Sequence, residues 1–288
     1  MCRENDVKRD EMLKKIIYAA LILSAGIGSA YAKVNWISEY DAALKAAKSS
    51  GKMLLVQISS ETCIYCRKMD NEVLNTEAIA KLCNQVKCAK FDSVLNPDGV
   101  QLTRQFKIPG TPATLLLDSD GGFIRILNGY IPLERFTKEI DNTLVRVKEF
   151  DKTLSLLKTD PKNLDALAAA GNEYFERRLY EKAVFYTNEV IKLDPENAKS
   201  KTDAAYLLRA GISLFQSNDI QSGLKDLTLI LDKWPSSRSA KTALYLKGLI
   251  LIHKGETEEG KHHLQNFKDK YPEEQEMIRR IDSILARL

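Results

Sequence analysis

Apolar and polar positions follow two different patterns along this chain, and the change falls near residue 150. Before it, short apolar runs typical of strands lie between stretches with helical spacing. The runs predict strands at 52–59, 86–92, 113–118 and 123–127, and helices at 36–50, 63–74, 76–84, 98–106 and from Leu133 onward. Gly51 ends the first helix, and "SDGG" at 119–122 is a tight turn. This order predicts an α/β domain with a central mixed sheet and helices on both faces.

The second half of the chain is predicted to be wholly helical, and its sequence pattern repeats. Three glycines each lie 24 residues before a proline: Gly171 before Pro195, Gly211 before Pro235 and Gly248 before Pro272. Around these anchors the same positions stay apolar or small: Leu167, Leu207 and Leu244; Tyr174, Leu214 and Leu251; Ala183, Gly223 and Gly260; Val190, Ile230 and Phe267. Small residues suit a close helix crossing and proline ends a helix, so each unit predicts two antiparallel helices. A non-repetitive helical bundle is the alternative, and three coincident spacings count against it.

Composition and charge narrow the class of protein. The chain has 288 residues, enough for two domains, with 44% apolar and 28% charged residues as in soluble globular proteins. The formal net charge of +4 is small for this length, and there is no dense block of lysine or arginine. We therefore expect no nucleic-acid partner.

Residues 1–32 have the features of a secretory signal peptide. From Met12, two lysines precede an apolar run from Ile16 to about Gly28, and Ala30-Tyr31-Ala32 supplies small residues for cleavage. The run is short for a membrane span, although an uncleaved N-terminal anchor is the main alternative. We expect an exported protein of the periplasm or cell envelope, in which disulfides are permitted.

The stretch "SSETCIYCRKM" at 59–69 holds the candidate chemistry, Cys63 and Cys66. The pair lies where a predicted strand gives way to a helix. Unpaired N–H groups and the helix dipole stabilise a thiolate there, so we expect the pKa of Cys63 to fall below the free value of about 8.5. Cys63 would be the exposed nucleophile, and Cys66, one turn further on, would resolve the mixed disulfide.

Two other interpretations of the pair remain open. One is a zinc site, since the spacing of Cys63, Cys66, Cys83 and Cys88 approximates a four-thiolate zinc pattern. Such a site needs its cysteines on short knuckle turns, whereas the first pair is predicted at the start of a helix and the second pair at a helix end and in a strand. A purely structural crosslink between Cys63 and Cys66 would constrain little, because the loop it closes is so short. Redox chemistry is favoured over both, and no metal is expected.

Cys83 and Cys88 are predicted at a helix end and in the next strand, close enough to bridge. A structural disulfide is the first interpretation. Two buried free thiols and a second redox relay are the alternatives.

The first half resembles the thioredoxin superfamily over about residues 36–148, through its strand, C-x-x-C and helix, and through "GTPATLLLD", which places Thr111-Pro112 before a strand. "TCIYC", "GTPA" and "NGYIP" look more like bacterial disulfide isomerases and their relatives than like cytosolic thioredoxin, and small cell-envelope thioredoxin-like reductases are the other close match. The resemblance implies a cis Pro112, backbone contact of Thr111 with a substrate strand, and a substrate surface that includes Ile64 and Tyr65. Thr62 and Gln57 depart from the family, which often has tryptophan and a buried aspartate there.

The second half resembles the tetratricopeptide repeat, in three units over about residues 164–272. The resemblance implies a surface for a protein partner or for self-association. The expected division is a signal peptide at 1–32, a thioredoxin-like domain at 33–148, a linker helix at 149–163, and repeats with a capping helix at 164–288.

Together these features predict an exported thiol–disulfide oxidoreductase, a reductase or isomerase that acts on protein disulfides. It would need a redox partner to reset the cysteine pair but no cofactor. The alternative is a non-catalytic scaffold or adaptor of the cell envelope, which the departures at Thr62 and Gln57 would allow.

Overall fold

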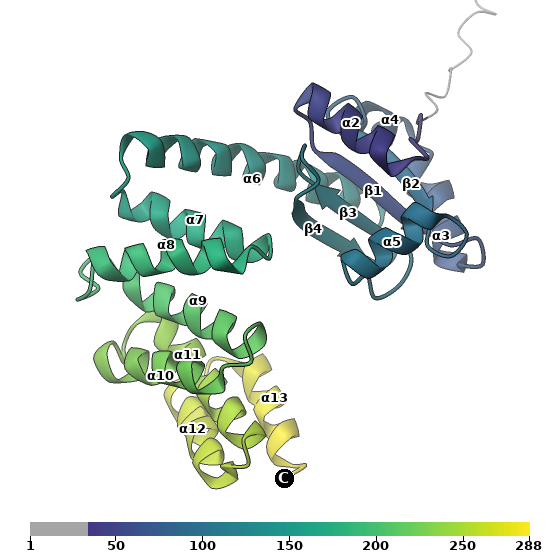
Figure 1. Ribbon diagram of the computed structural model, residues 1–288. Coiled ribbons are helices and arrows are strands. Elements are labelled where there is room, and N and C mark those ends of the chain that lie inside the picture. The colour runs from purple at the N-terminus through teal and green to yellow at the C-terminus, as the bar shows by residue number, and fades with distance from the viewer. Residues whose placement is uncertain (1–33) are drawn as a thin grey trace, which may run out of the picture.

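The computed structural model describes residues 34–288, and the predicted signal peptide lies outside them. The first domain is built on a four-stranded sheet of order β2-β1-β3-β4 (Figure 1). Its strands are β1 (Leu54–Ser59), β2 (Lys87–Asp92), β3 (Ala113–Leu117) and β4 (Phe123–Asn128). β1 pairs in parallel with β2 and antiparallel with β3, and β4 pairs antiparallel with β3. The predicted mixed sheet is therefore confirmed.

Helices cover both faces of this sheet. The helices α2 (Tyr40–Ser50) and α5 (Pro97–Gln105) pack Ala43, Ala47 and Leu102 on one face. The helices α3 (Ile64–Met69) and α4 (Glu77–Leu82), with the start of α6 (Leu133–Thr159), cover the other face. Every residue of β1 is buried, because this central strand has neighbours on both edges and helices on both faces.

Two predicted helices differ locally from the structure. The helix predicted at 36–50 begins only at Tyr40, because Ile37 is extended and forms a parallel bridge with Ala89 of β2. The helix predicted at 63–74 begins at Ile64 and changes after Met69 into a π-helical turn, η1 (Asp70–Leu74). There the Asn75 N–H donates to the carbonyl of Asp70, five residues back, at 3.0 Å.

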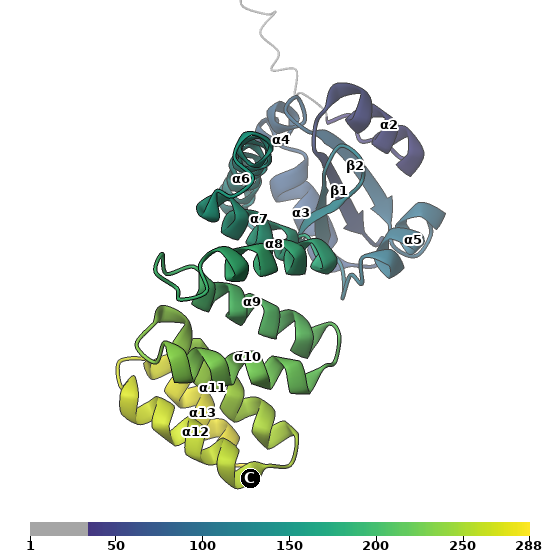
Figure 2. The ribbon, with the colours of Figure 1, turned by 60° about the vertical axis from the view of Figure 1, so that its left-hand side comes forward.

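The second half is a stack of helix pairs ending in a single helix (Figure 2). Its elements are α7 (Leu164–Glu176), α8 (Tyr180–Leu193), α9 (Thr202–Phe215), α10 (Ile220–Lys233), α11 (Arg238–His253), α12 (Thr257–Lys270) and α13 (Gln275–Leu285). The second helix of each pair ends two residues before the repeating proline. Small residues allow the close crossings that the repeat predicted: an added Cβ on Gly260 would lie 2.7 Å from the carbonyl oxygen of Gly248.

Helix α6 joins the two halves as one continuous element of 27 residues (Figure 1). Phe136 and Ile140 pack in the core of the first domain, whereas Phe150 packs edge-on against Tyr174 of α7. The expected linker segment therefore starts inside a helix that already belongs to the sheet domain. Among residues 34–288, no helix combines the length and the apolar character that a membrane crossing requires.

Candidate functional site

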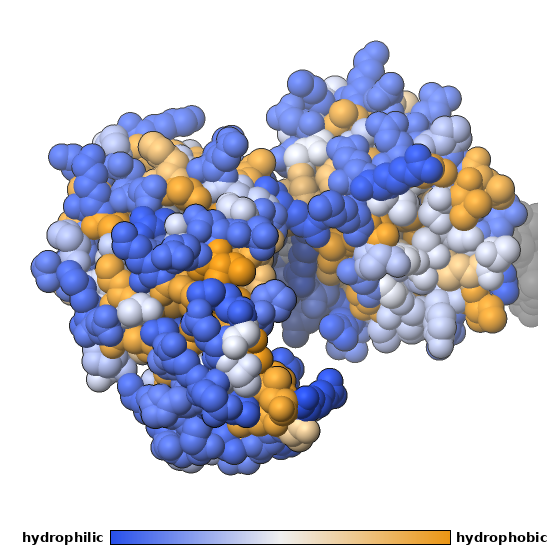
Figure 3. All heavy atoms as spheres, turned by 60° about the horizontal axis from the view of Figure 1, so that its bottom comes forward, coloured by the Kyte–Doolittle hydropathy of each residue, from blue (hydrophilic) through white to orange (hydrophobic). Residues whose placement is uncertain are grey.

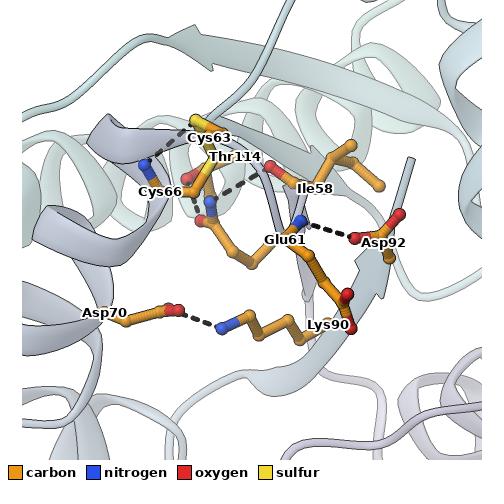
Figure 4. Close-up of polar contacts among 9 residues, drawn as sticks. Ile58, Glu61, Cys63, Cys66, Asp70, Lys90, Asp92 and Thr114 are labelled. Atoms are coloured by element: carbon orange, nitrogen blue, oxygen red, sulfur yellow. Dashed lines mark hydrogen bonds and ion pairs between the residues drawn. A yellow bond between two sulfur atoms is a disulfide. The ribbon is translucent and has the colours of Figure 1, made fainter. Parts of the chain in front are cut away.

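Cys63 and Cys66 lie where β1 gives way to α3, and they are joined by a disulfide. Cys63 is the N-cap of α3, and its sulfur accepts the Cys66 N–H at 3.1 Å (Figure 4). A helix N-terminus leaves such N–H groups without backbone partners, so this donor would stabilise a Cys63 thiolate. Cys63 is half-buried, whereas Cys66 is buried. Cys63 is thus the more accessible of the two cysteines, as the sequence predicts.

The structure brings the predicted Thr111–Pro112 loop against this pair. The peptide bond between these residues is cis, as the resemblance implies. The carbonyl oxygen of Thr111 lies 3.5 Å from the Cys63 sulfur, although 48 residues separate them. A reduced Cys63 thiol at this position could donate a hydrogen bond to that carbonyl. Ile64 and Tyr65 project outward beside it, and both are highly exposed.

Gln57 lies on β1, six residues before Cys63, and is fully buried. Its Oε1 accepts a hydrogen bond from the Thr114 hydroxyl at 2.7 Å, and its Nε2 donates to the Ile58 carbonyl at 3.4 Å (Figure 4). The neutral amide of Gln57 is therefore stable at this buried position, because it has two hydrogen-bond partners. An aspartate carboxylate in its place would need stronger donors to offset the cost of burying its charge. Gln57 supplies no charge to the site.

An ion pair between Asp70 and Lys90 forms a part of the site that sequence reasoning missed. The Lys90 Nζ lies 2.5 Å from the Asp70 carboxylate, and both side chains are partly buried. They line a cavity of about 380 Å³ together with Cys66 and Trp36. Two signals were present in the sequence: Asp70 is one helical turn after Cys66, and Lys90 interrupts the apolar run of its strand. In the sheet, Lys90 pairs in register with Gln57.

Asp92, at the end of β2, is a second residue that was missed. Its carboxylate accepts the N–H groups of Val94 and Leu95, both at 2.8 Å, and of Glu61 at 3.0 Å. Burial raises the pKa of Asp92, but these three backbone hydrogen bonds outweigh it and hold the pKa below its usual range. The carboxylate ties the loop after β2 to the loop that precedes Cys63.

Cys83 and Cys88 form a second disulfide, between the end of α4 and β2. The zinc alternative is therefore wrong, because the four sulfurs form two separate bonds. Among the residues that the structure describes, no group of three or more His, Cys, Asp or Glu side chains is placed to hold a metal ion. Cys88 pairs in register with Leu55, four residues before Ser59, so it lies about 13 Å along the sheet from the end of β1, where the loop to Cys63 begins. Nothing in this placement supports a redox relay.

Comparison with known proteins agrees with both halves of the fold. Residues 40–144 match the family model of a thioredoxin-like domain, and residues 242–274 match that of a tetratricopeptide repeat. The thiol:disulfide interchange protein DsbD of Pseudomonas fluorescens is 27% identical over 113 residues, which are 39% of this chain and 18% of that protein. DsbD of Ralstonia nicotianae is 24% identical over 95 residues, 33% of this chain and 16% of that one. The chain thus spans less than a fifth of these relatives.

One solved structure with a similar domain is a thioredoxin from Thermus thermophilus. It is 29% identical with a TM-score of 0.36, over 40% of this chain and 89% of that one.

Proposed function

We propose that this protein is a thiol–disulfide oxidoreductase that acts on protein disulfides. Its residues 40–144 match a thioredoxin-like domain, and its residues 242–274 match a tetratricopeptide repeat. One observation carries the proposal. The Cys63 sulfur receives the Cys66 N–H at a helix start and lies 3.5 Å from the Thr111 carbonyl beside Pro112. A purely structural crosslink between Cys63 and Cys66 would need neither the helix N-terminus nor the Thr111–Pro112 loop beside it.

The reaction consists of two reversible exchanges. The Cys63 thiolate attacks one sulfur of the substrate disulfide; a mixed disulfide forms, the substrate bond breaks, and the departing sulfur takes a proton from solvent. Cys66 then gives up its proton and attacks the Cys63 sulfur, which releases the second substrate thiol. The substrate gains two electrons and two protons, and the cysteine pair is left oxidised. A dithiol redox partner then supplies two electrons and two protons to the cysteine pair, which restores its reduced form.

The surrounding residues support these roles. Cys66 is buried, so it is shielded from other thiols, while the cavity lined by Asp70 and Lys90 gives water a path to it. Thr111 and Pro112 would hold an extended substrate segment, and Ile64 and Tyr65 would contact it because they are exposed next to Cys63. Burial of Cys66 behind Cys63 makes Cys63 the sulfur that meets the substrate first.

We further propose that the protein is exported to the periplasm or cell envelope and that the repeats bind a protein partner or a second copy. The pattern at residues 1–32 supports export. The proposed division is 33–148 for the redox domain, 149–163 for the linker and 164–288 for the repeats.

Insulin reduction with a thiol donor tests the activity. Wild-type protein should accelerate reduction, and Cys63→Ser should lower the rate to that without protein, because the attacking sulfur is lost. The double variant Cys83→Ser/Cys88→Ser is the matched control and should keep the activity. Equal rates for wild type and Cys63→Ser would instead favour the non-catalytic scaffold.

Trapping tests the assignment of the two sulfurs. Cys66→Ser leaves the attacking thiol but removes the resolving one, so mixed disulfides with substrate proteins should accumulate on a non-reducing gel. Cys63→Ser should trap few, because Cys66 is buried. The opposite pattern would exchange the two roles.

A further inference from the structure

Two large apolar side chains are exposed on the loop after β2, beside the cysteine site. Val94 is 68% exposed and Leu95 is 65% exposed, close to the 71% of Ile64 and 63% of Tyr65. All four lie at the end of the sheet where β1 and β2 finish, since parallel strands end at the same edge. Figure 3 shows hydrophobic residues at the surface on the side of this domain farthest from the repeats. Exposed apolar clusters of this kind commonly mark binding surfaces.

The loop that carries Val94 and Leu95 is firmly held. Both of their N–H groups donate to the Asp92 carboxylate, and the Ser93 N–H donates to the Ser59 carbonyl at 2.8 Å. The Asn96 side chain then caps α5 by accepting the Gly99 N–H at 2.9 Å. Neither apolar side chain packs in a core, so folding alone gives no reason for apolar residues here.

The same side chains form one wall of a shallow hollow of about 590 Å³. Val94, Leu95, Pro97 and Val100 line its apolar part, and Gln101, Arg104 and Gln105 line the rest. A hollow of this composition suits an aliphatic or aromatic side chain that has a carboxylate close by. We call it the β2–α5 hollow.

The loop that forms the hollow adjoins the loop that precedes Cys63, because one carboxylate, that of Asp92, accepts hydrogen bonds from both. The Glu61 N–H donates to Asp92, so the loop that leads into Cys63 is joined to the loop that carries Leu95. A substrate segment joined to Cys63 would therefore pass next to the hollow. Its rigid walls would reduce the ordering cost of binding.

We propose that the β2–α5 hollow is a substrate subsite, which takes an apolar side chain near the substrate cysteine and pairs Arg104 with an acidic residue beside it. This inference rests on the proposed oxidoreductase function and adds the class of polypeptide that the site prefers. Side-chain burial in the hollow supplies affinity, and Arg104 supplies selectivity between acidic and neutral neighbours.

Model disulfide peptides and a small aromatic disulfide, DTNB, test the subsite. The reference peptide carries Leu and Glu after its cystine, and it serves as both the Leu peptide and the Glu peptide in the comparisons. The Ser peptide replaces its Leu by Ser, and the Gln peptide replaces its Glu by Gln. In Leu95→Ser, the ratio of kcat/KM for the Leu peptide to that for DTNB should fall about tenfold, because burial of the Leu side chain is lost. The Ser peptide should show little further loss. Arg104→Ala should lower kcat/KM for the Glu peptide but not for the Gln peptide.

Val145→Ser is the matched control, because Val145 is 55% exposed on α6 and does not line the hollow. It should keep the wild-type ratio. If Leu95→Ser keeps that ratio too, or only changes self-association in sedimentation, the subsite is overturned while the oxidoreductase stands. If wild-type protein reduces neither peptide nor DTNB, the oxidoreductase function fails first.

Discussion

Arg178 donates a hydrogen bond from Nη1 to the carbonyl oxygen of Phe106 at 3.2 Å, which joins the turn between α7 and α8 to the sheet domain. Its guanidinium also lies 4.2 Å from the centre of the Phe123 ring, which stacks on Phe106. Phe106 follows α5 and begins the segment that leads to Thr111. The repeats therefore contact the base of the loop that faces Cys63.

Arg177, the preceding residue, strengthens the same junction. It is buried, pairs with Glu173 at 2.9 Å within α7, and lies 3.6 Å from Asp118 in the turn after β3. A buried arginine is stable only with such partners. The two arginines together hold the α7–α8 turn against the sheet domain.

Arg178→Ala should lower the free energy of unfolding by about 1 kcal/mol, because a hydrogen bond and a cation–π contact are lost at a partly exposed site. Arg178 has φ +59°, which a side chain disfavours. Arg178→Gly loses the same contacts but relieves this strain, so it should be about 1 kcal/mol more stable than the alanine variant. Urea unfolding measures both. Arg135→Ala, an exposed position on α6, is the control, and an equal loss there would contradict the docking role.

Asp92 should make part of the stability depend on pH. Because its pKa is lowered in the folded state, its contribution is complete above the unfolded value near 3.9 and is lost as pH falls through the depressed value. Asp92→Asn cannot titrate, so its unfolding free energy should fall less steeply than that of wild type between about pH 5 and pH 2. Urea unfolding across this range measures the two slopes, and parallel curves would contradict the assignment.

The close helix crossing in the third repeat is sensitive to a single methyl group. A Cβ on Gly260 would lie 2.7 Å from the Gly248 carbonyl oxygen and 2.9 Å from the Ile252 nitrogen, and backbone cannot move aside easily. Gly260→Ala should therefore cost about 1–3 kcal/mol in thermal or urea unfolding. Gly211, inside α9, has nothing within 4 Å of an added Cβ, so Gly211→Ala should stabilise by about 0.5–1 kcal/mol. If both substitutions changed the free energy of unfolding in the same direction, the α11–α12 crossing would be looser than these distances indicate.

Patterns along the chain were sufficient to predict most elements. The buried run of β1 and the Gly51 stop come from local sequence, and the structure places them within two residues of the predicted bounds. The repeating Gly-to-Pro spacing likewise predicted where α8, α10 and α12 end, because proline cannot continue a helix. Cys63 and Cys66 could be found for the same reason, since strand, turn and helix start adjoin in sequence.

Contacts between distant residues could not be predicted in this way. Asp70 and Lys90 are 20 residues apart, and Arg178 and Phe106 are 72 apart. Their pairing depends on sheet order and on the length of α6, which no local pattern specifies. The π-turn after Met69 was missed too, because helical spacing does not register one extra residue in a turn.

The Cys83–Cys88 disulfide should stabilise the sheet domain without taking part in the proposed thiol–disulfide exchange. Replacing both residues by Ala in a Cys63→Ser/Cys66→Ser background isolates this bond, and it should lower the unfolding free energy by about 2 kcal/mol for so short a loop. With reductant present the difference should shrink, because the background protein then loses its crosslink as well. Trypsin cleaves after Lys87, so non-reducing mass mapping should find two peptides joined through Cys83 and Cys88. Separate peptides with free thiols, together with equal stabilities, would instead favour two buried cysteines.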